Sequence, residues 1–164
     1  MTKIAIVGGS ATGKSAVARA LAAAKALALR NCGEEVKKVA RLCGISVDNV
    51  SEVCHREIDA ESQRFVMQSG PVLLEGRFLR YVLSAFPEAL MVIELTANIE
   101  IRRDRWASRV NRSVTLEEVL SSDGSDVEFT SRMYAGLDPL PSYTINTSKL
   151  TVKQVVSKIL KLAP

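Results

Sequence analysis

The chain has 164 residues, of which 47% are hydrophobic and 24% charged; this suits one globular domain and excludes a disordered or collagen-like chain. The formal net charge is +4, but residues 1–45 carry eight basic and two acidic side chains, and residues 46–100 carry four basic and nine acidic. This alternation, with only 5% aromatic residues, is not the basic and aromatic pattern of a nucleic-acid-binding protein. We therefore expect no nucleic-acid partner.

The sequence shows no sign of a membrane or secretory segment. No apolar run reaches the roughly 18 residues of a membrane-spanning helix, and the N-terminus lacks a signal-peptide pattern. The three cysteines, Cys32, Cys43 and Cys54, lack the close pairs typical of zinc sites, and their odd number favours reduced thiols. We expect a cytoplasmic monomer with no membrane partner.

The N-terminal part of the chain predicts a strand, a helix, a short apolar segment and a second helix. Lys3–Val7 is apolar enough for a buried strand, and Lys14–Lys25 predicts a helix because its apolar residues recur at steps of three and four. The short apolar segment Leu27–Leu29 ends at a turn over Asn31–Gly33. A second helix then spans Glu34–Cys43 and stops at the next glycine.

The middle of the chain predicts another helix and two buried strands. Ser46 caps a helix that includes Val50 and Val53. The continuous apolar runs Pro71–Leu74 and Leu90–Leu95 are typical of parallel strands that are buried on both faces. Strands separated by helices indicate an α/β fold with a parallel sheet covered on both faces, and ligands bind beyond the carboxyl ends of such strands.

The last third of the chain predicts an arginine-rich helix over Asn98–Ser108 and a helix that begins at a capping box of Thr115 and Glu118. Ser121–Ser125 is predicted to be a polar loop. The remaining predicted elements are a proline-rich turn, a strand and a capped terminal helix, at Leu137–Ser142, Tyr143–Ile145 and Thr151–Leu160.

The segment between the first strand and the first helix is a complete P-loop pattern, Gly-x-x-x-x-Gly-Lys-Ser. Its glycines let backbone N–H groups converge on phosphate oxygens, and the helix N-terminus adds a favourable dipole. In this pattern Lys14 reaches the β- and γ-phosphates of ATP and the Ser15 hydroxyl ligates Mg²⁺. The Asn-Lys-x-Asp motif of regulatory GTPases is not found, so a small-molecule kinase fits better. The phosphate-binding positions are Gly8, Gly9, Ser10, Ala11, Thr12, Gly13, Lys14 and Ser15.

The chain resembles the short, archaeal-type cytidylate kinases, which are P-loop nucleoside monophosphate kinases. Ser15–Gly33 aligns without gaps with that family's stretch from the P-loop serine to the acceptor-site glycine. Pro71–Arg77 resembles the family strand that ends in Leu-Glu-Gly-Arg, and Leu90–Ala97 resembles the strand that follows. Ile145–Ser148, with the sequence Ile-Asn-Thr-Ser, resembles the closing strand before the last helix.

This resemblance implies a P-loop NTPase fold with a five-stranded parallel sheet, helices on both faces and two helical insertions. It implies one kinase domain over residues 1–164, with an acceptor-binding subdomain over about 31–69 and a lid over about 105–132. The implied reaction is the Mg²⁺-dependent transfer of the γ-phosphoryl group of ATP to CMP or dCMP. The expected partners are therefore small-molecule nucleotides.

The resemblance also assigns roles to individual residues. Arg77 follows the carboxyl end of a strand and is expected to bind the acceptor phosphate. Arg102, Arg105 and Arg109 recur at helical steps, so one helix face presents three cations toward the lid. The implied catalytic residues are Lys14, Arg105 and Arg109. The implied acceptor-binding residues are Asn31, Lys37, Asp59 and Arg77, and the implied metal ligands are Ser15 and, through a water molecule, Glu75.

Several positions depart from the family pattern. Asn31 and Lys37 stand where the family has Ser and Arg, and a lysine lacks the bidentate fork of an arginine. In the lid, Ser122 and Phe129 replace two arginines, and the loss of one such donor costs on the order of a hundredfold in rate. Ala26 stands where the family has a glycine at the end of the first helix.

These departures leave other interpretations open. A kinase with a different small-molecule acceptor fits Lys37 and the altered lid, and a catalytically weak ATP-binding regulatory module fits the missing lid arginines. The arginine-rich helix is also compatible with a solvated charged face, and Glu75 with a plain strand end. We expect His55 to be structural, because nothing near it in the sequence orients it for catalysis, and Trp106 to anchor the core.

Overall fold

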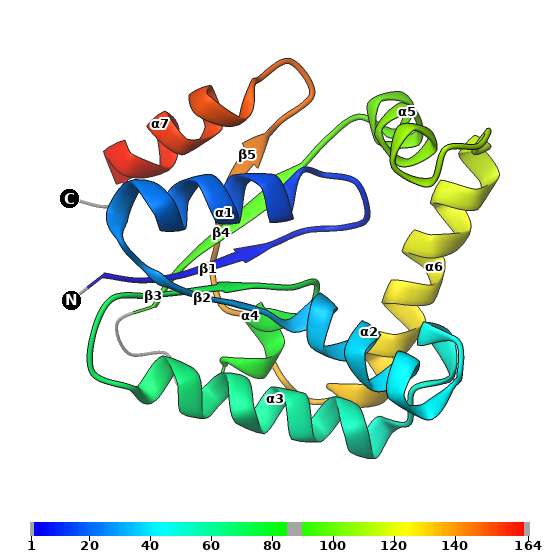
Figure 1. Ribbon diagram of the computed structural model, residues 1–164, viewed down its shortest axis with the longest axis horizontal. Coiled ribbons are helices and arrows are strands. Elements are labelled where there is room, and N and C mark those ends of the chain that lie inside the picture. The colour runs from blue at the N-terminus through cyan, green and yellow to red at the C-terminus, as the bar shows by residue number, and fades with distance from the viewer. Residues whose placement is uncertain (1, 85–89, 163–164) are drawn as a thin grey trace.

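The computed structural model describes residues 2–84 and 90–162, and the predicted domain over 1–164 reaches beyond these ranges. Five strands and seven α-helices alternate along the described residues (Figure 1). The strands are β1 (Lys3–Val7), β2 (Ala28–Asn31), β3 (Val72–Glu75), β4 (Leu90–Thr96) and β5 (Tyr143–Asn146). The helices are α1 (Lys14–Lys25), α2 (Cys32–Cys43), α3 (Glu52–Met67), α4 (Leu79–Val82), α5 (Ile99–Val110), α6 (Leu116–Met133) and α7 (Val152–Leu162).

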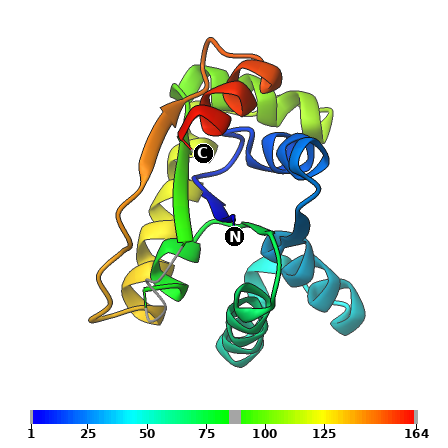
Figure 2. The same cartoon turned by 90° about the vertical axis from the view of Figure 1, so that its left-hand side faces the viewer.

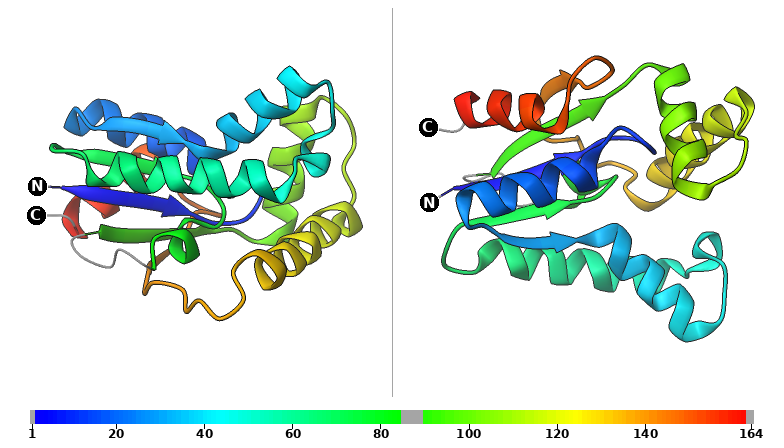
Figure 3. Two further views of the ribbon diagram at one scale, coloured as in Figure 1. Left: turned by 90° about the horizontal axis from the view of Figure 1, so that it is seen from below. Right: turned by 45° about the horizontal axis from the view of Figure 1, so that its top comes forward.

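The strands form one parallel sheet in the order β2-β3-β1-β4-β5, which confirms the predicted fold class. The central strand β1 is almost wholly buried and pairs with β3 on one side and β4 on the other. Because all strands run in the same direction, their carboxyl ends meet at one edge, where α2, α5 and α6 are gathered (Figure 3). This is the edge at which α/β proteins bind ligands.

Helices cover both faces of the sheet, as Figure 2 shows. On one face, α1 and α7 pack on β1, β3, β4 and β5, with Leu21 and Ile159 fully buried against Ile6 and Ile93. On the other face, α3, α4 and the end of α6 share a second core. The two cores are separated only by the sheet, so they fix the strand ends that carry the site.

Two helix boundaries differ from the prediction. Helix α2 begins at Cys32, because the side chain of Asn31 accepts a hydrogen bond from the Glu34 N–H (3.0 Å) and caps the helix. The predicted turn at this place is therefore a strand end and a helix start. Ser46 caps only a single 3₁₀ turn, and α3 begins after its own cap, Ser51.

The predicted polar loop over Ser121–Ser125 is wrong, since these residues lie inside α6. The capping box of Thr115 and Glu118 starts the helix as expected. Within it, the Ser125 hydroxyl donates to the carbonyl of Ser121 (3.0 Å), so a polar side chain that favours turns is satisfied inside the helix. The serine-rich composition of this segment suggested a loop, but capping and packing at the edge of the sheet outweigh that propensity.

The described residues contain no helix long and apolar enough to cross a membrane. The three cysteines are free thiols, and no group of three metal-binding side chains that includes them is found in these parts of the chain.

Candidate active site

The P-loop joins β1 to α1 and wraps closely against β4. At Gly8, with φ 144°, a Cβ atom would lie 2.2 Å from the carbonyl oxygen of Leu95, so only glycine fits. Ala11 also has a positive φ, 58°, although it carries a side chain. Within the described residues, none of the backbone N–H groups of 9–15 donates to a protein acceptor. A run of free N–H groups at a helix N-terminus is suited to an anion such as a phosphate.

Lys14 adds a buried cation to this loop. Its Nζ donates to the carbonyl oxygen of Gly9 (2.7 Å), and no carboxylate of the described residues lies in salt-bridge contact with it. Burial lowers the pKa of Lys14 to about 8, although the nearby charge of Glu75 opposes this shift. A phosphate would supply the direct ion-pair partner that the described residues do not provide.

Ser15 and Glu75 bring two oxygen donors together beside the loop. The Ser15 hydroxyl donates to Oε2 of the buried Glu75 (3.3 Å), which ends β3. Burial raises the pKa of this carboxyl group, while Lys14 and the hydrogen bond from Ser15 oppose the rise. A hydroxyl and a carboxylate next to a phosphate site are the ligand types that Mg²⁺ takes, so the two residues fit the predicted metal role.

Arg105 contacts the P-loop through Thr147. Its guanidinium donates to the hydroxyl (2.9 Å) and to the carbonyl oxygen (2.8 Å) of Thr147, just beyond β5. The buried Thr147 hydroxyl in turn donates to the Thr12 carbonyl oxygen (2.8 Å). Arg105 is thus held against the backbone of the loop, whereas the exposed Arg109, one helical turn later, lines the adjacent cleft.

Arg102 is the most buried arginine of α5. Its Nε donates to the Ser10 carbonyl oxygen (2.8 Å), and its two Nη atoms bind the carboxylate of Asp123 on α6 (2.8 and 2.5 Å). The hydroxyls of Ser10 and Ser122 also lie 3.3 Å apart. These contacts attach α6, the predicted lid, to the P-loop.

A second ion pair joins α6 to the end of β3. Arg77, the predicted acceptor-phosphate ligand, donates from Nη1 to Oδ1 of Asp126 (2.6 Å). The pKa of Lys14, lowered mainly by burial, also responds to the charges of Glu75, Arg77, Asp126 and Arg109. These charged groups therefore surround one point at the carboxyl edge of the sheet.

The cleft that opens from this point has a volume of about 680 Å³ and is lined by residues of α2, α3, α4, α5 and α6. It includes five predicted site residues, Ser10 of the P-loop together with Lys37, Asp59, Arg77 and Arg109. Asn31 is not among the lining residues, because its side chain caps α2. The ammonium group of Lys37 is paired with Glu34 on its own helix (2.7 Å).

Asp59 lines the cleft and is partly buried. The Tyr134 hydroxyl donates to its Oδ2 (2.9 Å), and burial raises the pKa of Asp59 to about 6, against the effect of this hydrogen bond. No salt bridge to Asp59 is found among the described residues. The second carboxylate oxygen is available to accept a hydrogen bond from a ligand.

An aromatic wall formed by His55, Phe78, Phe129 and Tyr134 lines the same part of the cleft. Phe78 and Phe129 stack with their ring centroids 4.9 Å apart, and His55 meets Phe129 edge-on at 4.9 Å. Phe129 thus places an apolar ring where the family pattern has an arginine. His55 packs as a structural side chain would.

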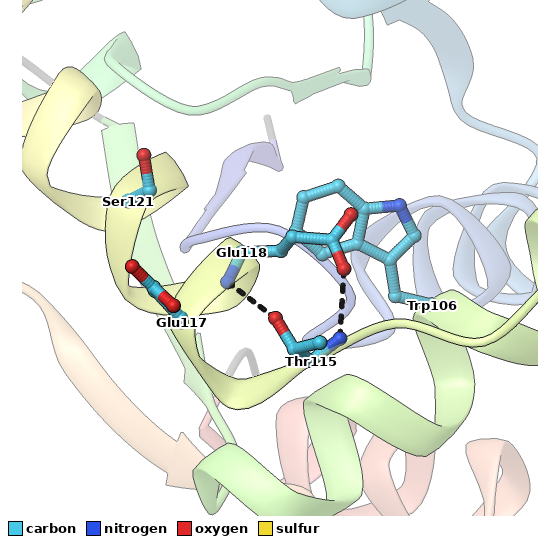
Figure 4. A pocket seen from close by; sticks show the side chains of 5 residues that line it. All are labelled: Trp106, Thr115, Glu117, Glu118 and Ser121. Atoms are coloured by element: carbon cyan, nitrogen blue, oxygen red, sulfur yellow. Dashed lines mark hydrogen bonds between the residues drawn. The ribbon is translucent and has the colours of Figure 1, made fainter.

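A smaller pocket of about 360 Å³ lies between α5 and the start of α6 (Figure 4). Its polar groups are used by the capping box, in which Thr115 N–H donates to Glu118 Oε2 (2.8 Å) and Glu118 N–H to Thr115 Oγ1 (3.1 Å). The Trp106 ring lies across this pocket and is half-buried. The prediction that Trp106 anchors the core is therefore wrong, because α5 turns the buried Arg102, and not its tryptophan, toward the P-loop.

Sequence reasoning missed the partners that tie α6 to the site. Asp123 and Asp126 lie three residues apart, so on a helix they share one face; the mistaken loop at 121–125 hid this signal. The bond between Asp59 and Tyr134 joins residues 75 positions apart, and no local pattern indicates it.

Comparisons with known proteins found a partial sequence relative and solved structures that share the fold. No family model matches the chain. A cytidylate kinase of Thermotoga neapolitana is 32% identical over 115 residues, which are 65% of this chain and 50% of that protein. The chain thus spans half the length of the curated relative that it matches.

Solved kinases share the whole architecture at low sequence identity. A gluconokinase from Sinorhizobium meliloti superposes with a TM-score of 0.68 at 14% identity, over 99% of this chain and 93% of that one. A shikimate kinase from Acinetobacter baumannii, solved in complex with shikimate, gives 0.67 at 20% identity, over 99% and 92%. At these identities the likeness shows the fold alone, a five-stranded parallel sheet with helices on both faces.

Proposed function

We propose that this chain is an ATP-dependent kinase that phosphorylates a small molecule bound in the cleft between α2, α3 and α6. The observation that carries this proposal is Lys14, a buried cation without a carboxylate partner, in a loop of unpaired N–H groups that opens into the cleft. Transfer of a phosphoryl group needs positioning and neutralised charge more than covalent chemistry, and this arrangement supplies both.

In this proposal the P-loop holds the phosphates of ATP, and Lys14 neutralises charge on the transferred group. Ser15 and Glu75 would hold Mg²⁺, which would supply further positive charge beside the phosphates. Arg105 keeps the loop in shape through Thr147, and Arg109 reaches the cleft from the same helix. With α6 held over the P-loop by Arg102 and Asp123, water would be excluded, so that transfer outruns hydrolysis.

CMP and dCMP are the first acceptors to test. The resemblance of Pro71–Arg77 and Ile145–Ser148 to cytidylate kinases and the similarity to the Thermotoga neapolitana enzyme favour them. The free oxygen of Asp59 is suited to the exocyclic amine of cytosine. The paired states of Lys37 and Arg77 favour a second candidate, an acceptor other than a nucleotide.

The proposal is tested by a coupled ADP-release assay with ATP, Mg²⁺ and a panel of CMP, dCMP, UMP, AMP, nucleosides and small sugar acids. We expect at least one acceptor to raise ADP release well above the rate with ATP alone. If none does, the kinase proposal is refuted.

A catalytically weak ATP-binding module is the remaining candidate, favoured by Ser122 and Phe129 in the lid. It predicts tight ATP binding by calorimetry with no turnover, and no gain from the variant Ser122→Arg/Phe129→Arg. A gain in turnover with a nucleoside monophosphate in this variant would contradict the module and support a kinase whose lid has changed.

A further inference from the structure

The cations on the acceptor side of the cleft are already neutralised by the protein. Lys37 is paired with Glu34 (2.7 Å), Arg77 with Asp126 (2.6 Å), and Arg132 with Glu52 (2.5 Å). Of the four Lys and Arg side chains that line the cleft, only Arg109 has no carboxylate partner among the described residues.

The lining as a whole is also balanced in charge. Four carboxylates face these four cations: Asp48, Asp59, Asp126 and Glu128. A doubly charged acceptor phosphate would therefore enter a cleft without excess positive charge, next to the γ-phosphate of ATP. Like charges at such short range repel strongly unless cations are free to separate them.

Asp126 lies near the P-loop and beside the residue expected to bind an acceptor phosphate. Its carboxylate binds Arg77, the residue that an acceptor phosphate would need, and its charge also acts on Lys14 in the P-loop. The side chain is only 20% exposed, so the ion pair is partly shielded from solvent. An acceptor phosphate would have to displace this carboxylate, whereas a neutral hydroxyl group can sit beside it.

The other residues that line the cleft indicate what the rest of the acceptor molecule contains. The stacked rings of Phe78 and Phe129 form an apolar wall, and Asp59, which lines the same cleft, offers a hydrogen-bond acceptor. Such a wall suits a planar ring, and the carboxylate suits an N–H group on that ring.

We propose that the acceptor is an uncharged, ring-bearing alcohol such as a pyrimidine nucleoside, and that Asp126 both selects against a phosphate and receives the hydroxyl proton. This inference rests on the proposed kinase function and narrows its substrate class. The hydroxyl oxygen forms a bond to the γ-phosphorus, and the bond from that phosphorus to the β–γ bridging oxygen breaks. ADP leaves with the electron pair, and the proton passes to the carboxylate of Asp126.

The test compares cytidine with CMP in two measurements on the wild-type protein. Calorimetry in the presence of Mg²⁺ and a non-hydrolysable ATP analogue gives the two affinities, and the ADP-release assay gives the two values of kcat/KM. We expect cytidine to bind about tenfold or more tightly than CMP, a difference of about 1.4 kcal/mol. Tighter binding of CMP overturns the inference, with or without turnover.

The variant Asp126→Asn tests the role of the carboxylate. We expect kcat with cytidine to fall by about a hundredfold, because the proton acceptor is lost, and CMP to bind about tenfold more tightly, because Arg77 is freed. Glu117→Gln, an equal charge change at an exposed position of α6, is the control and should alter neither quantity. An unchanged ratio of the two affinities in Asp126→Asn overturns the selective role.

The two proposals fail in different ways. If ATP does not bind and no acceptor is phosphorylated, the kinase function itself is refuted, and this inference with it. If CMP is phosphorylated more efficiently than cytidine, the kinase function stands and only the assignment of a neutral acceptor is overturned.

Discussion

The P-loop and the acceptor cleft lie side by side, but they differ in whether their cations are paired with carboxylates. In the P-loop, Lys14 is buried and donates only to a backbone carbonyl. In the cleft, Lys37 and Arg77 are about half exposed, at 51% and 43%, and each is bound to a carboxylate. The first region needs an anion from outside to complete it, whereas the second is complete without one.

The two regions also differ in the elements that hold them in place. The P-loop is held by Leu95 of β4, Arg105 of α5 and Thr147, which follows β5, so its geometry depends on the core of the sheet. The acceptor cleft is built by helices that contact one another through side chains near solvent. We therefore expect the phosphate site to be rigid and the cleft to tolerate changes of specificity.

The largest effect is expected where the P-loop needs its cation. The variant Lys14→Ala should lower turnover by at least about a hundredfold, because the charge on the transferred group is no longer neutralised. The ADP-release assay measures this loss, and calorimetry shows the accompanying change in ATP affinity. Lys38→Ala, at an exposed site on α2, is the matched control. Equal losses in both variants would show that Lys14 has no special role.

The next largest effect is expected for the contacts of Arg102, which join α6 to the P-loop. Arg102→Ala should lower the free energy of unfolding by about 1–3 kcal/mol, because the Ser10 carbonyl and Asp123 lose a buried, bidentate partner. Arg103→Ala removes an exposed arginine paired only with its neighbour Asp104, and should cost less than about 0.5 kcal/mol. Urea unfolding of both variants measures the difference; similar values would mean that these contacts add no stability.

A pH dependence is expected from the buried end of the cleft. The pKa of Asp59 is raised by burial from 3.8 to about 6, so over this range the folded protein holds a proton that the unfolded chain has released. Stability should therefore fall as the pH rises from 4 to 6, by on the order of 1 kcal/mol, and Asp59→Asn should remove this fall. Urea unfolding at both pH values is the measurement, with the exposed Asp48→Asn as control. A fall of the same size in Asp59→Asn would assign it to another group.

The smallest effect tests α6 alone. Gly124 lies inside the helix with nothing within 4 Å of an added Cβ, so Gly124→Ala should stabilise the protein by about 0.5–1 kcal/mol in thermal unfolding. The equivalent change Gly136→Ala, at φ 79°, should destabilise it instead. A loss of stability in Gly124→Ala would contradict a helical backbone with open space at this position.

Much of the P-loop side could be predicted from the sequence, because its signals are local. The strand, the glycine loop and the first helix are contiguous, and Lys3–Val7 and Lys14–Lys25 have the predicted bounds. Ser15 was predicted from the P-loop pattern, and the role of Glu75 was implied by the family resemblance.

The lid and the cleft were less predictable, because their contacts join distant parts of the chain. The pair of Arg77 and Asp126 spans 49 positions, and that of Arg132 and Glu52 spans 80. Composition suggested a loop at 121–125, but a capped helix forms there and places its acidic residues on one face. Side chains such as Asn31, used here as a helix cap, have several local uses that only the fold distinguishes.

Trp106, the single tryptophan of the chain, lies between α5 and the start of α6 and also lines the main cleft. An indole in this place changes its fluorescence when the polarity around it changes. The protein thus carries an intrinsic optical reporter beside the cleft in which we propose that the acceptor binds. Stopped-flow fluorescence can follow the order in which ligands arrive, without any label attached to the chain.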